Sequence, residues 1–234
     1  MFKHSMFLVI IFGIALSAAA AMNPIEVLQS DADLEKKVEA CRLISISGDV
    51  NAIPVLEALL PTEELSAMAR YALEPMPAGE ADAALRRALE TTSGRLKAGV
   101  VASLGVRRDA AAVPEIISLL KDADGFIVEA AIRSLGRIGT PECIDALTNA
   151  VSQPGLPFTI MCALGDGISF AAETAMRAGN VGDAIRLYDA AYGAESLPVH
   201  VRAAGLRGAI LARAPQDGLH LLLDAIKGDN PDFF

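Results

Sequence analysis

Residues 94–124 carry two helix patterns separated by a short turn, and they read GRLKAGVVASLGVRRDAAAVPEIISLLKDAD. The apolar residues of each pattern recur at helical spacing, which places them on one face; they are Val100, Val101 and Leu104 in the first pattern, and Val113, Ile116, Ile117, Leu119 and Leu120 in the second. Gly105 stands where a left-handed residue would end the first helix, and Asp109 can cap the second. Pro114 lies in the first turn of the second helix, where its missing N–H leaves no hydrogen bond unmade. The stretch therefore predicts a pair of antiparallel helices.

The same pattern recurs along the chain. Residues 101–105, VASLG, return as IRSLG at 132–136, a shift of 31 residues. A shift of 60 residues takes Ile53 to Val113, each followed by proline. One helix pair cannot bury its apolar face alone, so several stacked pairs are needed to build a continuous core. The expected units are 33–64, 65–93, 94–124 and 125–154. The sequence thus predicts four repeats over 33–154 in an all-α, right-handed α-solenoid of stacked antiparallel helix pairs.

The composition agrees with helices and restricts the partners. Hydrophobic residues make up 53% of the chain and aromatic residues 5%, with no tryptophan, so the apolar mass is aliphatic and rich in alanine, the best helix former. The formal net charge of −9 lacks the basic excess that a phosphate backbone requires, and we expect no nucleic-acid partner. The short basic clusters Arg86-Arg87 and Arg107-Arg108 are expected on solvated helix faces or in turns.

Three features of the repeat resemble HEAT repeats. These are the Leu-Gly end of the first helix, the Val-Pro-x-Ile-x-x-Leu-Leu second helix and the Asp-rich turn that follows. More narrowly, they are similar to the short HEAT repeats of phycobilin-lyase-like proteins. Residues 94–154 carry the resemblance best, and 33–93 carry it more loosely. The resemblance implies an α-solenoid, but a fold of this kind does not carry a function with it.

The C-terminal third departs from this pattern. Residues 155–196 predict two helices, at 170–180 and 181–192, whose small residues and turn glycine resemble one tetratricopeptide-type hairpin. Residues 197–234 predict a last HEAT-like pair, at 199–212 and 216–226, followed by an incomplete C-terminus. We expect the chain to be truncated, to be the first domain of something longer, or to use its end as a contact, because solenoid ends normally need a polar capping repeat.

Residues 1–21 have the pattern of a secretory signal peptide. Lys3 precedes an apolar run at 7–16, and a run of small residues then ends at Ala21, as a cleavage site requires. The run is shorter than the roughly 20 apolar residues of a membrane span, and an uncleaved N-terminal anchor is the alternative interpretation. We expect a periplasmic or secreted protein with a linker at 22–32 and no stable membrane span after cleavage.

No constellation of residues points to a catalytic, cofactor or metal site. Beyond the signal peptide the only histidines are His200 and His220, and the chain lacks the recurring His-Glu pairs with which HEAT-repeat hydroxylases hold a di-iron centre. The cysteines, Cys41, Cys143 and Cys162, are expected as small buried residues on helices, with a Cys143–Cys162 bridge as the alternative. Phosphate-binding glycine loops and Gly-x-Ser-x-Gly are also absent. We expect that the chain is not an enzyme and binds no cofactor.

Three hypotheses for function follow. The first is a non-catalytic, exported scaffold for protein–protein interaction, because stacked second helices in solenoids line extended binding surfaces. The second is a lyase-like or chaperone-like protein that handles a cofactor-bearing partner, and the third is an accessory N-terminal domain of a larger envelope assembly. The first predicts a contact face on exposed positions of the second helices: Glu57, Arg86, Arg87, Glu115, Ser118, Asp145 and Asn149.

Overall fold

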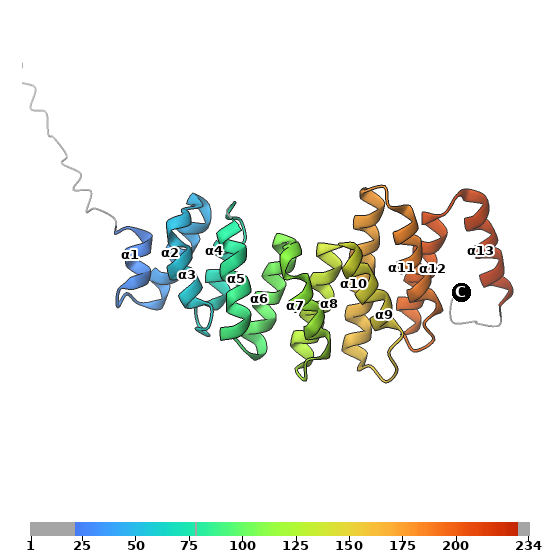
Figure 1. The fold of residues 1–234 in the computed structure, drawn as a ribbon, viewed down its shortest axis with the longest axis horizontal. Helices are drawn as coiled ribbons and strands as arrows, with labels where there is room; N and C mark the ends of the chain where they lie inside the picture. Colours follow the sequence, from blue (N-terminus) through green and yellow to red (C-terminus); the bar gives the residue numbers. More distant parts are fainter. Residues whose placement is uncertain (1–21, 78, 229–234) are drawn as a thin grey trace, which may run out of the picture.

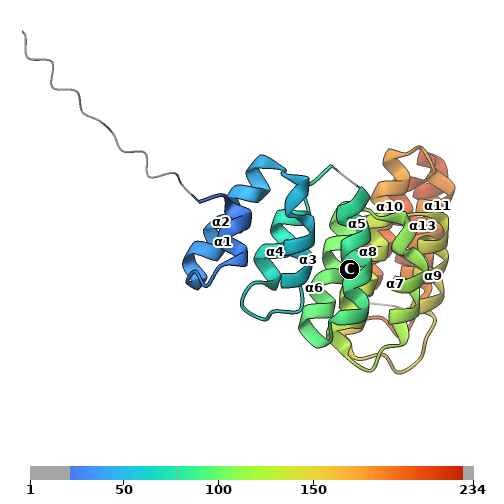
Figure 2. The ribbon, with the colours of Figure 1, turned by 60° about the vertical axis from the view of Figure 1, so that its left-hand side comes forward.

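The computed structural model describes residues 22–77 and 79–228, which form thirteen α-helices and three short 3-10 helices. The helices follow one another broadly in chain order along the long axis, from α1 at one end to α13 at the other (Figure 1), and α1 and α2 also lie at one end in the turned view (Figure 2). Their bounds are α1 Pro24–Gln29, α2 Leu34–Ser47, η1 Val50–Ala52, α3 Ile53–Leu59, α4 Ser66–Leu73, α5 Gly79–Thr91, α6 Gly94–Arg107, η2 Ala110–Ala112, α7 Val113–Ser118, η3 Leu119–Lys121, α8 Gly125–Ile138, α9 Pro141–Val151, α10 Phe158–Arg177, α11 Val181–Gly193, α12 Val199–Ala212 and α13 Pro215–Lys227. The expected signal peptide and the last residues, 229–234, lie outside the described residues.

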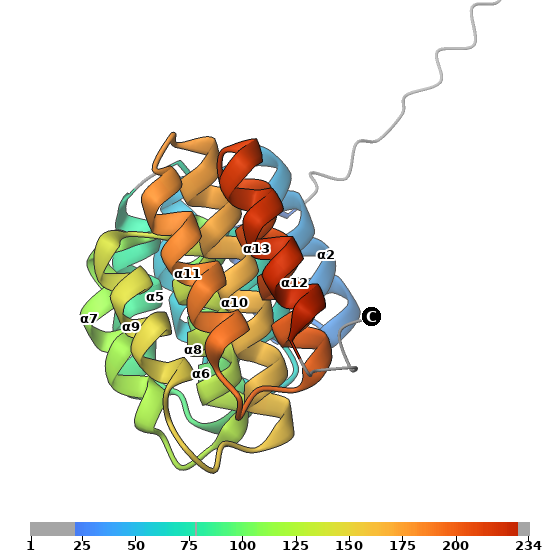
Figure 3. The same cartoon turned by 90° about the vertical axis from the view of Figure 1, so that its right-hand side faces the viewer.

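The helices stack in two layers. The first helices of successive pairs contact one another in the order α2, α4, α6, α8, α10 and α12, and the second helices α7, α9 and α11 form the other layer. The view along the long axis shows α7 and α9 on one side of the stack and α10 and α12 on the other (Figure 3). No strand occurs within the described residues, so the all-α solenoid of stacked helix pairs is confirmed.

The core follows the 31-residue shift of the sequence. Leu73, Leu104 and Leu135 occupy equivalent positions on the first helices, and all three are completely buried. The second helices contribute an equivalent series that is also completely buried: Leu85, Ile116 and Leu147. Burying one such side chain contributes about 1.5–3 kcal/mol. Because each layer packs on the next, these contributions add up along the stack instead of around a single centre.

Glycine and serine set the spacing of the first helices. A Cβ on Gly105 of α6 would lie 2.6 Å from the Ser134 hydroxyl of α8, and a Cβ on Gly136 of α8 would lie 2.4 Å from the carbonyl oxygen of Gly167 on α10. The expectation that Gly105 ends the first helix is therefore wrong. Helix α6 continues to Arg107, and Arg108 adopts the left-handed conformation at its end, with φ 53°. Gly105 is needed inside the helix because α8 approaches it closely.

Other local expectations have mixed outcomes. As expected, the Asp109 carboxylate accepts a hydrogen bond from the backbone N–H of Ala111 at the start of η2. The Thr140 hydroxyl caps α9 in a similar way. Residues 22–32, expected as a linker, contain the short helix α1, which packs on α2.

The helix expected to begin at residue 170 begins instead at Phe158 and runs unbroken for 20 residues, with Gly165 and Gly167 as helical residues inside it. None of the described helices combines the length and apolarity of a membrane span.

The three cysteines are free thiols. Cys41 and Cys143 are buried on α2 and α9, as expected, whereas Cys162 on α10 is half-buried. Burial raises the pKa of the Cys41 thiol to about 11 and also raises the pKa of Cys143. Both thiols therefore stay protonated at neutral pH and act as small apolar core residues.

Candidate interaction surface

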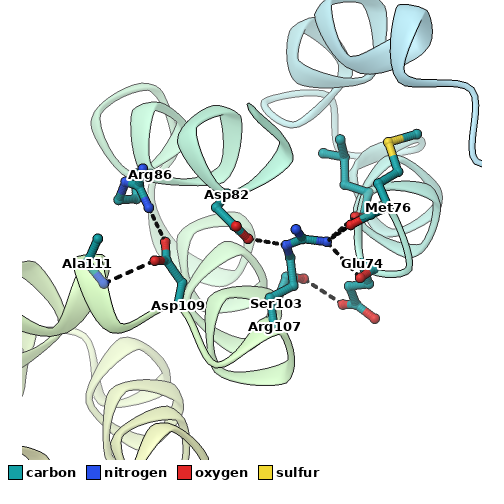
Figure 4. A network of polar contacts seen from close by, with 9 residues as sticks. Glu74, Met76, Asp82, Arg86, Ser103, Arg107, Asp109 and Ala111 are labelled. Atoms are coloured by element: carbon teal, nitrogen blue, oxygen red, sulfur yellow. Dashed lines mark hydrogen bonds and ion pairs between the residues drawn. The ribbon is translucent and has the colours of Figure 1, made fainter. Parts of the chain in front are cut away.

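Charged side chains join successive helix pairs. The Arg107 guanidinium of α6 donates hydrogen bonds of 2.8 Å to the carbonyls of Leu73, Glu74 and Met76, at the end of α4 (Figure 4). Its Nε also contacts the Asp82 carboxylate of α5, and only 7% of the Arg107 side chain is exposed. The expectation of a solvated Arg107 is therefore wrong. The last carbonyls of a helix have no partner within it, and here one arginine from the next repeat donates to the carbonyl of Leu73, the last residue of α4, and to two carbonyls of the loop that follows.

Two further contacts extend this network. The Ser103 hydroxyl of α6 donates to the Glu74 carboxylate at 2.7 Å, and Arg86 of α5 pairs with Asp109 (Figure 4). Asp109 also caps η2, so one carboxylate connects α5 to the beginning of the next second helix. These contacts fix the relative positions of the helices that carry the expected binding surface.

We call the outer side of α3, α5, α7, α9 and α11 the second-helix face. Four of its seven candidate residues hold repeats together. Arg87 forms a bidentate ion pair with the Glu57 carboxylate, in which both N–O distances are 2.7 Å. Hydrogen bonding to that carboxylate raises the pKa of Arg87. Asp145 of α9 pairs with Arg186 of α11 at 2.7 Å. The fourth is Arg86, through its pair with Asp109.

The other three candidates lie exposed on α7 and α9. The Ser118 hydroxyl donates only to the carbonyl of Glu115, one turn back. Within the described part of the chain, the side chains of Glu115 and Asn149 make no hydrogen bond or ion pair. The structure therefore divides the candidate face into residues that link repeats and residues that are available to a partner. Glu115, Ser118 and Asn149 belong to the second group.

An apolar cavity of about 600 Å³ adjoins Asn149, one of the available residues. It lies between α7 and α9 and reaches down to α8 and α10, and its apolar lining comes from Ile117, Leu120, Val128, Ile132, Ala146, Ala150, Leu156, Ile160 and Leu164. Three polar side chains, Lys121, Asn149 and Gln153, also border it. Sequence reasoning treated Leu120 as an ordinary core position. The sequence pattern did not predict the cavity, because the 3-10 helix η3 follows α7 from Leu119 onward and leaves Leu120 only half-buried.

A thiol–imidazole pair was also missed, because its members are 38 residues apart in sequence. Cys162 Sγ of α10 lies 3.8 Å from His200 Nε2 of α12, and the His200 ring packs against Phe158. Zinc requires three or four converging ligands, and no group of three or more His, Cys, Asp or Glu side chains with that geometry occurs in the parts of the chain that the structure covers. The pair alone therefore builds no metal centre.

The comparisons with known proteins bear on these same helices. Residues 81–156, from α5 to the loop after α9, match the sequence profile of HEAT repeats. These residues are HEAT repeats. They contain most of the second-helix face and nearly all of the cavity lining, so the expected resemblance is confirmed where the surface is built. The tetratricopeptide-type hairpin at 155–196 stays a prediction.

The fold of the chain beyond these repeats also resembles solved structures. The complex of CpcE and CpcF of phycocyanin lyase from Nostoc sp. PCC7120 matches with a TM-score of 0.50 and 19% identity, over 86% of this chain and 92% of that chain. Two engineered proteins, each 18% identical, match with TM-scores of 0.45 and 0.42, over 83% and 91% of this chain and 97% and 76% of theirs. No curated protein sequence matches significantly. At these identities, the likeness to the lyase complex concerns the fold alone.

Proposed function

We propose that this chain is a non-catalytic, exported scaffold that binds a protein partner on its second-helix face. The observation that carries the proposal is the apolar cavity of about 600 Å³ beside exposed polar residues of η3, of α9 and of the loop after α9. Protein interfaces combine an apolar centre with a polar rim, and their strongest contacts place a large side chain in such a pocket. Lys121, Asn149 and Gln153 supply the rim. The likeness to a two-protein lyase complex agrees with a role in protein association.

Filling the cavity should weaken partner binding. The partner is first identified by capture from the secreted or periplasmic fraction, and its Kd is then measured by calorimetry for the purified pair. Ala150→Phe places a ring in the cavity, and we expect the Kd to rise at least tenfold, about the effect of losing one anchor residue. Lys121→Glu reverses the rim charge and should weaken binding about threefold to tenfold.

The matched control for Lys121→Glu is Lys227→Glu, because Lys227 is also exposed but lies on α13, away from the cavity. The Kd should not change in this variant. Equal losses in both lysine variants would point to net charge instead of the second-helix face. If no protein partner binds, and added bilin or haem shifts its absorbance on mixing with the chain, a cofactor-handling role replaces the scaffold.

Export is the second part of the proposal, and it rests on the sequence pattern of residues 1–21. Expression of the full chain in bacterial cells should yield a protein in the periplasmic or secreted fraction whose first residue is Met22, as determined by N-terminal sequencing. Recovery of an intact N-terminus in the membrane fraction would favour the uncleaved anchor. Recovery in the cytoplasm would contradict export.

A further inference from the structure

A second groove lies on the other layer of the solenoid, between the first helices α6 and α8. Its volume is about 260 Å³. Arg95 of α6 and Arg133 and Arg137 of α8 line it together with the Phe126 ring, and its remaining lining includes small side chains such as Ala102. Three arginines therefore converge on one groove in a chain whose net charge is −9.

Two of these arginines are held by aromatic rings instead of carboxylates. The Arg95 guanidinium carbon lies 4.7 Å from the centre of the Phe126 ring, and that of Arg137 lies 5.6 Å from the centre of Phe170. Neither arginine forms an ion pair within the described residues. Stacking on a ring orients a guanidinium and leaves its N–H donors free to bind an anion. Both aromatic residues remain exposed to solvent, Phe126 by 53% and Phe170 by 41%.

The third arginine is already compensated. Arg133 contacts Glu129, one turn back on α8, at 3.1 Å and Asp166 of α10 at 3.2 Å. One arginine and two carboxylates leave the middle of the groove with a net negative charge, and positive charge remains at the ends, at Arg95 and Arg137. The charge pattern therefore favours a ligand with two separated anionic groups over one with a single compact charge.

The length of the groove restricts the ligand further. From Phe126, where Arg95 is held, to Arg137 the helix α8 advances about 16 Å at roughly 1.5 Å per residue. An extended peptide covers the same distance with about five residues. Small groove-lining side chains such as Ala102 give a main chain room to approach. A carboxylate at each end can then accept two parallel hydrogen bonds from a guanidinium.

We propose that this groove binds an extended acidic segment, about five residues long, of a partner protein, with its carboxylates on Arg95 and Arg137. Polyanions fit this surface poorly, because a chain with a net charge of −9 repels nucleic acid and anionic membranes over longer distances. The groove is separate from the second-helix face, so this inference does not depend on the scaffold proposed above. A partner that engages both layers would gain affinity through effective concentration.

The test uses the full chain and a fluorescein-labelled peptide, Glu-Glu-Ala-Glu-Glu, in fluorescence polarisation. We expect the peptide to bind at least about tenfold more tightly than its Gln-Gln-Ala-Gln-Gln counterpart, and to lose affinity as salt is added. The double variant Arg95→Ala/Arg137→Ala should raise the Kd at least about tenfold. Arg95→Lys/Arg137→Lys keeps the charge but loses the planar fork, and should raise it by about threefold to fivefold.

The matched control is Arg87→Ala/Arg186→Ala, which removes the same charge from the second-helix face. Its Kd should stay within about twofold of the unmodified chain. Circular dichroism and thermal unfolding check that each variant folds. The inference is overturned if the two peptides bind equally well, if the control loses as much affinity as the Arg95 and Arg137 variant, or if single-stranded DNA or anionic phosphatidylglycerol vesicles bind through these arginines more tightly than the peptide.

Discussion

Replacing Arg107 with alanine should lower the free energy of unfolding by about 3–5 kcal/mol, as expected when one partner of a buried charged network is removed. The substitution leaves the carbonyls of Leu73, Glu74 and Met76 without their shared donor and leaves Asp82 without its cation. Buried polar groups that lose their partners keep the full penalty of desolvation. Urea unfolding followed by circular dichroism measures the loss. Hydrogen exchange should show that α4 and α5 lose protection first, because contacts in a solenoid are local.

The control for Arg107→Ala is Arg87→Ala. Arg87 makes an equally well-formed ion pair with Glu57, but 60% of its side chain is exposed, so its loss should lower stability by less than about 1 kcal/mol. The comparison separates a buried arginine that donates to carbonyls at a helix end from an exposed arginine in an ion pair between repeats. Similar losses in the two variants, or a loss below about 1 kcal/mol for Arg107→Ala, would show that the α4 carbonyls find water instead.

These two arginines also show where sequence reasoning succeeds and fails. The spacing of apolar residues predicts the helices and the buried positions, such as Leu104 and Ile116, because burial on one face is a local, periodic property. The pair Arg107-Arg108 gives no local sign that one member is buried, since its partners come from α4 and α5, 25 to 34 residues earlier. A surface interpretation is the natural one for adjacent charges, and tertiary contacts override it.

The two proposed binding surfaces also differ in how well the sequence predicts them. Arg95 and Phe126 are 31 residues apart, at equivalent positions of successive repeats, so a comparison of repeats in register can find such a contact from sequence. The apolar cavity has no comparable signal, because it depends on where α7 gives way to η3 and on the path of the loop after α9. Repeat periodicity thus predicts contacts along a layer, and it does not predict the irregularities that open a cavity between layers.

Substituting Gly136 with alanine should lower the free energy of unfolding by about 2–3 kcal/mol, the range for overpacking a well-filled interior. In an ordinary helix the same change stabilises by up to about 1 kcal/mol. Here the added Cβ would lie 2.4 Å from the carbonyl oxygen of Gly167, and backbone atoms cannot rotate away as a side chain can. Helices α8 and α10 must therefore separate. Thermal and urea unfolding measure the effect.

The matched control is Gly182→Ala in α11, where a Cβ meets no atom within 4 Å and stability should stay unchanged or rise by up to about 1 kcal/mol.

Gly136→Ala should also change the geometry of both proposed binding surfaces. Separation of α8 from α10 moves Arg137 away from Phe170 and widens the cavity between Ile132 and Leu164. We therefore expect weaker binding of the acidic peptide in the folded variant. A variant that loses stability yet binds the peptide unchanged would show that the ring of Phe170 does not orient Arg137.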